Sequence, residues 1–292
     1  MCIMIKNIKG IRDIINKYET FILDQWGVMH DGKVGYNHAI ESVKLLKKYK
    51  KNIIIISNSS KRKNSSINRL PILGFDKNMF IEVVTSGEMI WQKIFLFLDD
   101  YGKDLKNCFH IYNNAKDDGL EFREGLNNIN FVDEVDKADF ILACTPYDNS
   151  QPIDYIPLLK SSLERNLIMF CANPDFETIE NNNNKNLFCM GTIADLYEKM
   201  GGKVIILGKP SIEIYKEATK SLNFDLSKIV AIGDSLYHDI QGAINFGIDS
   251  VLITSGIHKD IFLEKNLSWE DKLKSKNLLN ITPTYICENF SI

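Results

Sequence analysis

Several features that would mark a protein class are missing from this 292-residue sequence. The six cysteines form no Cys-x-x-Cys pair, which argues against a zinc site and against a disulfide framework. The 35 lysines and arginines nearly balance the 38 aspartates and glutamates, and the net charge of -3 argues against a nucleic-acid surface or a polybasic membrane-binding face. We therefore expect any binding of phosphate groups to depend on a few local residues.

Long apolar segments are also missing. No run reaches the roughly 18 residues of a membrane span, and the opening MCIMIKNIKG lacks the apolar core of a signal peptide. We therefore expect a cytoplasmic protein with no membrane partner and no nucleic-acid partner. The chain is longer than the usual span of one hydrophobic core, which predicts two domains or one domain with a large insertion.

Short apolar runs that end in polar residues recur along the chain. Such runs are typical of buried parallel strands, which carry functional groups at their carboxyl ends. The runs cover residues 21–23, 52–56, 204–207, 228–232 and 251–253. Helical patterns lie between them, as the crossovers of a parallel sheet require. The sequence therefore predicts an α/β fold with a doubly wound, Rossmann-like parallel sheet.

Four stretches have helical spacing of their apolar residues and recognisable ends. Residues 38–50 form the first, with Asn37 as its expected N-cap. Thr192 resembles the first residue of a capping box that opens a second helix. Ser211 is expected to cap a third helix, and Gly247 to end the fourth.

The middle of the chain contains further short strands but fewer residues of chemical interest. We predict that residues 88–190 form an inserted α/β cap domain, and that residues 1–87 and 191–292 form the core. A cap over an active site would exclude water and supply substrate contacts. A cap of this size often allows self-association, which leaves a homo-oligomer open.

The predicted strand ends would bring Asp24, Asp234 and Lys209 together with Ser57 and Asn58. Two carboxylates beside a lysine suit Mg²⁺ and a phosphoryl group, because Mg²⁺ takes few protein carboxylates and shares its coordination shell with phosphate. Ser57 would donate a hydrogen bond to phosphoryl oxygens. Lys209 would neutralise charge on the phosphate and on the nucleophile.

Six short motifs, in this order, resemble the haloacid dehalogenase-like hydrolase superfamily, in its subfamily IIA phosphatase branch with a large α/β cap. They are Asp24-Gln25-Trp26-Gly27-Val28, Ile56-Ser57-Asn58-Ser59, Thr85-Ser86-Gly87, Ala172-Asn173-Pro174-Asp175, Gly208-Lys209-Pro210, and Gly233-Asp234-Ser235 with His238-Asp239. The resemblance implies a Mg²⁺-dependent phosphomonoester hydrolase. Its substrate would be a small phosphorylated metabolite, of the sugar phosphate or nucleotide class.

The resemblance also implies roles for single residues. Asp24 would attack phosphorus to form an aspartyl-phosphate, which water then hydrolyses. Ser57, Asn58 and Lys209 would bind the phosphate, and Asn58 would also help to orient the other two donors.

Further positions follow from the same resemblance. Mg²⁺ would be held by Asp24, by the backbone carbonyl of Trp26 and by Asp234, with Asp239 acting through a water or through hydrogen bonds. Asn173 and Asp175 would belong to the substrate-facing surface, as would the ring of Trp26.

Trp26 is the departure from the family pattern, because most phosphatases of this superfamily have an aspartate at that place. That aspartate protonates the leaving group and then activates water, which is worth about 10² to 10⁴ in rate. Asp31, His30, His238 or the substrate itself could take over this role. The alternatives are a phosphotransferase with a long-lived aspartyl-phosphate and a protein that binds Mg²⁺ and a phosphorylated ligand without efficient turnover. The Trp26 ring either packs between sheet and cap or forms an aromatic wall for a substrate ring.

Overall fold

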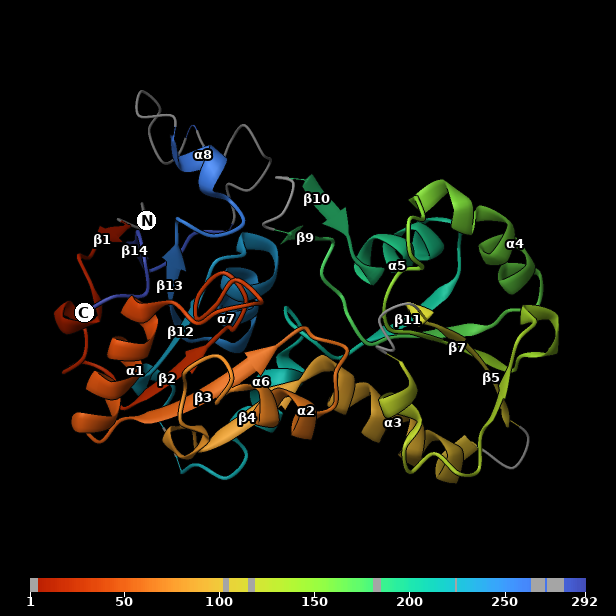
Figure 1. Cartoon of the computed structure of the whole chain (residues 1–292), viewed down its shortest axis with the longest axis horizontal. Helices are drawn as coiled ribbons and strands as arrows, with labels where there is room; N and C mark the ends of the chain where they lie inside the picture. Colours follow the sequence, from red (N-terminus) through yellow and green to blue (C-terminus); the bar gives the residue numbers. More distant parts are fainter. Residues whose placement is uncertain are drawn as a thin grey trace. The chain divides into compact units, whose positions relative to one another are not determined.

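The computed structural model describes residues 5–101, 105–114, 119–180, 185–223, 225–263, 271 and 281–292 (Figure 1). The chain forms two compact units. The first unit comprises residues 1–57, 67–84 and 209–292, and the second unit comprises residues 58–66 and 85–208. Within the described residues, the helices lack the combination of length and apolar character that a bilayer-crossing segment needs.

The first unit is built on a seven-stranded sheet with the order β1-β14-β13-β12-β2-β3-β4. Across the sheet, each neighbouring pair of strands from β1 through β14, β13, β12 and β2 to β3 is parallel, which confirms the predicted α/β class. The strands are β1 (Lys6–Asn7), β2 (Thr20–Leu23), β3 (Asn52–Ser57), β4 (Glu82–Thr85), β12 (Ile229–Gly233), β13 (Asp249–Ile253) and β14 (Tyr285–Cys287).

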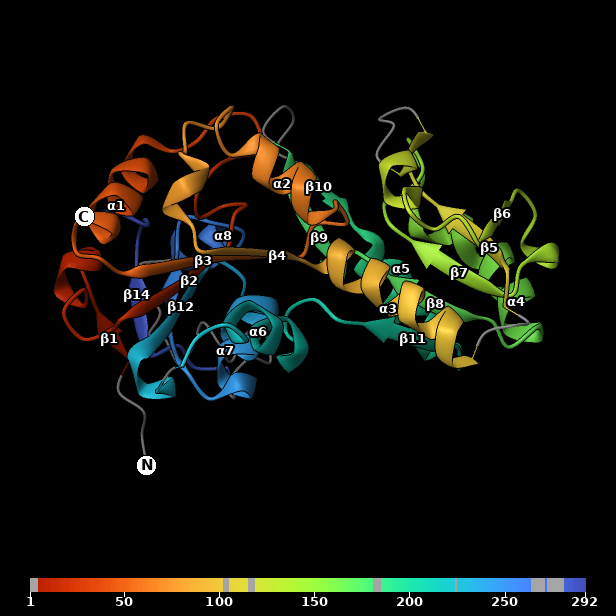
Figure 2. The ribbon, with the colours of Figure 1, turned by 90° about the horizontal axis from the view of Figure 1, so that it is seen from below.

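Helices cover both faces of this sheet. Figure 2 shows α1 on one face and α6 and α7 on the other. The helices are α1 (Asn37–Lys48), α6 (Ile212–Thr219), α7 (Gln241–Phe246) and α8 (Lys259–Leu263), and a π-helix (Leu236–Ile240) precedes α7. Helix α2 (Lys63–Arg69) crosses the boundary between the two units.

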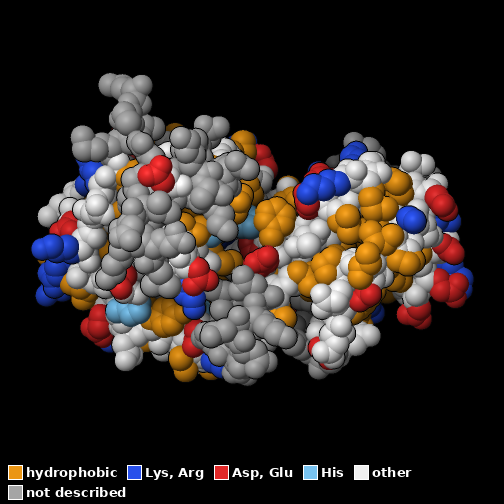
Figure 3. All heavy atoms as spheres, turned by 90° about the horizontal axis from the view of Figure 1, so that it is seen from above, with side chains coloured by type: hydrophobic (Ala, Val, Ile, Leu, Met, Phe, Trp, Pro, Cys, Tyr) orange, Lys and Arg blue, Asp and Glu red, His pale blue; other side chains and the backbone are white. Residues whose placement is uncertain are grey.

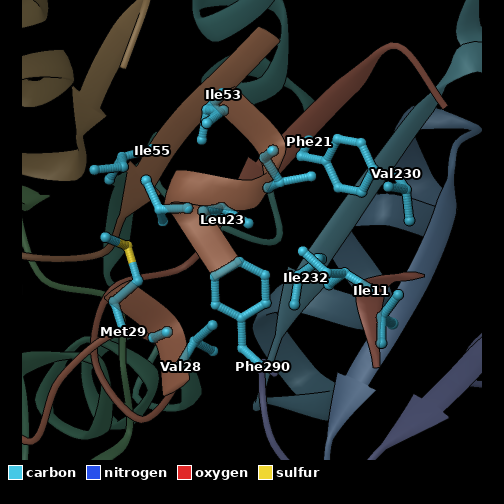
Figure 4. Close-up of a cluster of buried hydrophobic side chains, with 14 of the residues drawn as sticks. Ile11, Phe21, Leu23, Val28, Met29, Ile53, Ile55, Val230, Ile232 and Phe290 are labelled. Atoms are coloured by element: carbon cyan, nitrogen blue, oxygen red, sulfur yellow. The ribbon is translucent and has the colours of Figure 1, made fainter. Parts of the chain in front are cut away.

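The central strands are continuous apolar runs because both of their faces are buried. Alternate residues point to the same face of a strand, so Phe21 and Leu23 of β2 share a core with residues of both neighbouring strands. Figure 4 shows these two side chains among Ile53, Ile55, Val230 and Ile232, with Val28, Met29 and Phe290 beside them. This core fixes the backbone of β2 up to the residue that precedes Asp24.

The second unit contains a five-stranded parallel sheet with the order β11-β8-β7-β5-β6 and a two-stranded antiparallel ribbon of β9 and β10. Its strands are β5 (Asn107–Ile111), β6 (Asn130–Val132), β7 (Phe140–Ala143), β8 (Ile168–Cys171), β9 (Glu177–Glu180), β10 (Lys185–Phe188) and β11 (Lys203–Ile206). Its helices are α3 (Ser86–Tyr101), α4 (Ile156–Glu164) and α5 (Met190–Lys199). Residues alternate along β7, so that Phe140 and Leu142 belong to one core cluster and Ile141 and Ala143 to another.

The boundary of the second unit differs from the sequence-based expectation. We assigned residues 191–292 to the core, but residues 191–208 belong to the second unit. The physical reason is the pairing of β11 with β8, whose register joins Val204 to Met169. The strand before Lys209 therefore lies in the second sheet, and the expectation that it belongs to the same sheet as β2 was wrong.

Two helix starts also differ from the expectation. Helix α1 has Tyr36 as its N-cap residue, so Asn37 is the first helical residue. Helix α5 begins at Met190, and the Thr192 hydroxyl donates a hydrogen bond to the Phe176 carbonyl instead of opening a capping box. The other two ends are confirmed. The Ser211 side chain caps α6 by accepting from the Glu213 N–H, and a left-handed Gly247 ends α7.

Charged side chains of both signs are interspersed on the face that Figure 3 shows. This distribution agrees with the near balance of acidic and basic residues in the sequence.

Candidate active site

Three strand ends meet at the carboxyl edge of the first sheet. Asp24 follows the last residue of β2, Asp234 follows the last residue of β12, and Ser57 ends β3. The register places Leu23 beside Ile232 in β12 and beside Ile55 in β3, and the Asp24 N–H donates to the Ile232 carbonyl at 2.9 Å. The predicted convergence of these residues is therefore a consequence of parallel pairing in register.

Lys209 joins this edge from the segment that returns from the second unit. Its ammonium donates to Asp24 Oδ1 at 2.5 Å and to Asp239 Oδ1 at 2.7 Å. The Lys209 side chain is 3% exposed. A buried ammonium needs paired carboxylates, since an unpaired buried charge is strongly destabilising. Lys209 therefore holds the two carboxylates in a fixed arrangement.

Asp239 reaches the site because the chain turns sharply after β12. Ser235 caps the start of the π-helix, and its hydroxyl accepts a hydrogen bond from the His238 N–H at 3.3 Å. The other carboxylate oxygen of Asp239 accepts from the Ser235 N–H at 3.0 Å. A Cβ on Gly233 would lie 2.0 Å from Asp239 Cγ, so this close approach requires glycine.

The carboxylates of Asp24, Asp234 and Asp239 form a compact cluster. One oxygen from each lies within 4.8 Å of the others, and all three residues are buried. Three carboxylates and one ammonium leave two negative charges when all are ionised. Burial raises the pKa of Asp234 well above its usual value, and the neighbouring charges of Asp24 and Asp239 raise it further.

Two glycines and one backbone N–H were missed by sequence reasoning. Built Cβ atoms on Gly27 and Gly256 would lie 2.0 Å and 2.2 Å from Asp234 Oδ2, and the Ile257 N–H donates to that oxygen at 2.9 Å. The backbone at Gly27 and at Gly256 thus lies in close contact with the Asp234 carboxylate. Gly27 follows Trp26 directly and has a φ of 79°, a signal for a tight turn that the sequence alone did not tie to Asp234.

This donor set fits a divalent cation such as Mg²⁺. All three candidate ligands are hard carboxylate oxygens, which Mg²⁺ prefers, and two negative charges match one divalent ion. Burial is the main cause of the raised pKa of Asp234, and the repulsion from Asp24 and Asp239 that adds to it would be relieved by such an ion.

Trp26 lies on the loop that follows Asp24 and is 39% exposed. Its ring lies against Gly32, where a Cβ would be 2.1 Å from Trp26 Cη2, and it meets the ring of His30 edge-on at 5.8 Å between centroids. The Gly27 N–H donates to the His30 carbonyl at 2.9 Å, which closes the loop.

Two of the residues considered as substitute acid-base groups are engaged in this loop. His30 is 4% exposed, and its Nδ1 accepts from the Gly32 N–H at 3.0 Å. Burial and the nearby charge of Arg69 lower the pKa of His30 to about 4, so the ring is neutral at neutral pH. Asp31 Oδ1 accepts from the N–H groups of Lys33 and Val34 at 2.8 and 2.9 Å, a turn-forming arrangement.

The third candidate for the acid-base role is His238, which is buried and directly precedes Asp239 in the sequence. Its Nδ1 lies 3.1 Å from the Ser235 hydroxyl. Its part in proton transfer stays a prediction.

Three further sequence candidates meet in the second unit. The Asn58 amide donates to Asp175 Oδ1 at 2.8 Å, and the Asp175 N–H donates to Asn173 Oδ1 at 3.1 Å. A Cβ on Gly208 would lie 2.6 Å from Asn58 Oδ1. The structure thus brings Asn58, Asn173 and Asp175 together around the residue that precedes Lys209, and their roles toward a phosphate or a substrate stay predictions.

The parallel α/β core carries a lysine-bound aspartate and two further buried carboxylates at the carboxyl edge of its sheet. This is the arrangement expected of the hydrolase class that the sequence motifs resemble. Two family models match the chain. The model of haloacid dehalogenase-like hydrolases matches residues 21–95, and a HAD-hydrolase-like model matches residues 206–291. The chain belongs to the haloacid dehalogenase-like hydrolases.

Similar proteins agree with this family. A 4-nitrophenylphosphatase of Schizosaccharomyces pombe is 25% identical over 275 residues, covering 86% of this chain and 89% of that protein. The 5'-nucleotidase YutF of Bacillus subtilis is 22% identical over 254 residues, covering 83% and 89%. A haloacid dehalogenase-like hydrolase from Brucella suis has a TM-score of 0.79 and 27% identity, with 97% of this chain and 99% of that chain covered.

Proposed function

We propose that this protein hydrolyses phosphomonoesters of small metabolites, of the sugar phosphate or nucleotide class, through an aspartyl-phosphate on Asp24. One observation carries the proposal: the Lys209 ammonium bonds both Asp24 and Asp239 inside a buried three-carboxylate cluster. A nucleophile, a fixed cation and an excess of two negative charges at one strand edge suit phosphoryl transfer. The names of the fungal and bacterial relatives support the same chemistry.

Mg²⁺ would be held by Asp24, by Asp234 and by the backbone carbonyl of Trp26, with Asp239 acting through a water or through its bond to Lys209. When bound, the ion would withdraw charge from the phosphoryl oxygens and neutralise the excess negative charge of the carboxylates. The three buried carboxylates support this assignment.

The protein's own residues would carry out the remaining steps. A carboxylate oxygen of Asp24 attacks phosphorus while the bond from phosphorus to the leaving oxygen breaks, and the leaving oxygen takes the electron pair. The Ser57 hydroxyl and the Lys209 ammonium donate hydrogen bonds to the phosphoryl oxygens. Asn58 helps to orient these two donors. Water then attacks phosphorus and loses a proton, the bond from phosphorus to the Asp24 oxygen breaks, and phosphate leaves with the Asp24 carboxylate restored. The proton lost by water offsets the proton that the leaving oxygen takes up.

A screen of phosphate release tests this function. The wild type should release phosphate from small phosphomonoesters with Mg²⁺, and removal of divalent ions with EDTA should abolish release reversibly. Asp24→Asn should lose at least about 10³-fold in rate, because no other group forms the covalent intermediate.

Asp225→Asn, purified in the same way, is the matched control. Asp225 caps a short 3₁₀ turn by accepting from the Ser227 N–H, away from the carboxylate cluster, so its variant should keep full activity. Equal activity of Asp24→Asn and the wild type would refute the proposal. Binding of phosphate compounds without release would favour the ligand-binding alternative.

A further inference from the structure

The Trp26 loop is built to hold an aromatic ring in a fixed place. The ring packs against Gly32, which has a φ of 88° and no Cβ to push the ring away. The His30 ring supports it at an interplanar angle of 75°. The guanidinium of Arg69, from α2, donates to the Gly32 carbonyl and so anchors the part of the loop on which the ring lies.

The residue that carries this ring belongs to the loop beside the candidate nucleophile and the carboxylate cluster. Trp26 is two residues from Asp24, and the next residue, Gly27, packs against the Asp234 carboxylate. An indole held rigidly from one side, with 39% of the residue still exposed, leaves apolar area to contact another molecule. A tryptophan placed only to fill the core would be expected to lose most of its exposed area.

We propose that Trp26 is a specificity-determining residue, whose exposed indole stacks on a planar ring carried by the leaving group of the phosphate substrate. This inference rests on the proposed function and names its substrate class: phosphomonoesters that bear a flat aromatic ring, such as a nucleobase. Stacking against an aromatic side chain stabilises any base by its π-face, without base-specific hydrogen bonds. The enzyme would therefore select the ring and tolerate differences between rings.

The test compares two substrates of which only one carries an aromatic base. Adenosine 5'-monophosphate and ribose 5-phosphate release phosphate from the same primary carbon, so their leaving oxygens are closely matched. The quantity measured is the ratio of their KM values within each variant. This ratio cancels effects of a substitution on the metal or on the chemical step.

The wild type should bind the nucleotide about 5- to 100-fold better than ribose 5-phosphate, and Trp26→Ala should bring the ratio close to one. Trp26→Phe should keep part of the preference. The control is Tyr49→Ala, an aromatic residue that follows α1 and is 45% exposed, which should leave the ratio unchanged.

Gly32→Ala adds a test of ring position. A methyl group at this position would displace the indole, so the variant should lose the nucleotide preference in the wild-type background. In the Trp26→Ala background the same substitution should have no further effect on the ratio. Equal ratios in the wild type and Trp26→Ala, or a wild type without any preference, would overturn the inference.

A binding measurement separates this inference from the proposed function. If no variant releases phosphate, quenching of tryptophan fluorescence by adenosine 5'-monophosphate is followed in the wild type and in Trp26→Phe. If quenching is lost in Trp26→Phe, the contact between Trp26 and the substrate ring is supported even though the proposed phosphatase activity is refuted. Identical quenching curves in the two proteins would overturn the ring contact as well.

Discussion

The two ends of the parallel sheet in the first unit both carry charged side chains, but they balance the charge differently. At the amino end, Asp249 begins β13 and accepts from the Tyr18 hydroxyl at 2.5 Å and from the Lys17 ammonium at 2.9 Å. At the carboxyl end, one ammonium, that of Lys209, faces three carboxylates. The ion pair at the amino end thus joins one acid to one base, whereas the cluster at the carboxyl end has an excess of negative charge.

The pKa shifts of two aspartates show what this difference means. Burial raises the pKa of Asp249, but hydrogen bonds from Tyr18, Lys17 and Thr284 outweigh burial and hold that pKa below its ordinary value. Burial and like charges shift the pKa of Asp234 upward instead. The Asp249 network therefore stabilises the fold as it stands, whereas the carboxylate cluster at the other end would be completed by a cation and a substrate under the proposed function.

The largest effect on activity is expected from a substitution of Trp26, which lies on the loop at the carboxyl end of the sheet. Trp26→Asp restores the carboxylate that most phosphatases of the superfamily have at this place, and it should speed hydrolysis of ribose 5-phosphate by up to about 10² to 10⁴. The alkoxide leaving group needs a proton, and the aspartyl-phosphate needs a base. Steady-state phosphate release at saturating Mg²⁺ measures the gain.

Trp26→Asn is the matched control for that gain, since asparagine has the same size as aspartate but cannot transfer a proton. If Asn accelerates hydrolysis as much as Asp does, removal of the ring and not acid-base chemistry explains the change. A Trp26→Asp protein with no gain would mean that another group already supplies the proton.

A smaller effect is expected on stability when Mg²⁺ binds. At about 100 times its Kd, the ion should add about 2.7 kcal/mol to the free energy of unfolding. Asp234→Asn should lose this increment because it removes one of the three carboxylates, and Asp249→Asn should keep it. Urea unfolding with and without Mg²⁺ measures both variants. An equal response of the two variants would contradict the assignment of the metal to the carboxyl end.

The smallest effect concerns the amino end of the sheet. Asp249→Asn should cost about 1 to 2 kcal/mol of unfolding free energy at neutral pH, because the hydrogen bonds to a charged acceptor are weakened. The folded pKa of Asp249 is lowered, so its contribution is complete above the unfolded pKa of about 3.9 and is lost as pH falls through the folded pKa.

Unfolding curves at several pH values give the readout for Asp249. The difference between the wild type and Asp249→Asn should be constant near neutral pH and shrink below about pH 4. A difference that grew on acidification would have the wrong sign and would exclude this ion pair as its source.

The strands and the acids at their ends were predictable because buried parallel strands are continuous apolar runs. Phe21 to Leu23 and Ile229 to Ile232 are such runs, and Asp24 and Asp234 mark their ends. The strand before Lys209 has the same pattern, yet it pairs in the other sheet. An apolar run predicts a strand, but it shows neither how deeply the strand is buried nor which strand it pairs with, since β11 lies at a sheet edge and its apolar residues are only partly buried.

Contacts between distant segments were not predictable from the sequence. The network of Lys17, Tyr18 and Asp249 joins residues about 230 positions apart and has no local motif. The capping pattern at Thr192 was misleading because its hydroxyl found a partner in Phe176, from an earlier segment. The exposure of Trp26 likewise depends on Gly32 and on α2, which the motif around Asp24 does not contain.

Rapid acid quenching during turnover of a phosphomonoester, followed by intact-mass and peptide mass spectrometry, tests directly whether Asp24 is the nucleophile. We predict one phosphoryl group on the peptide that contains Asp24, accumulating because Trp26 cannot supply a carboxylate base for the second step. The adduct should be absent from Asp24→Asn and present in Asp225→Asn. An adduct on another residue, or undiminished phosphate release by Asp24→Asn, would contradict nucleophilic attack by Asp24.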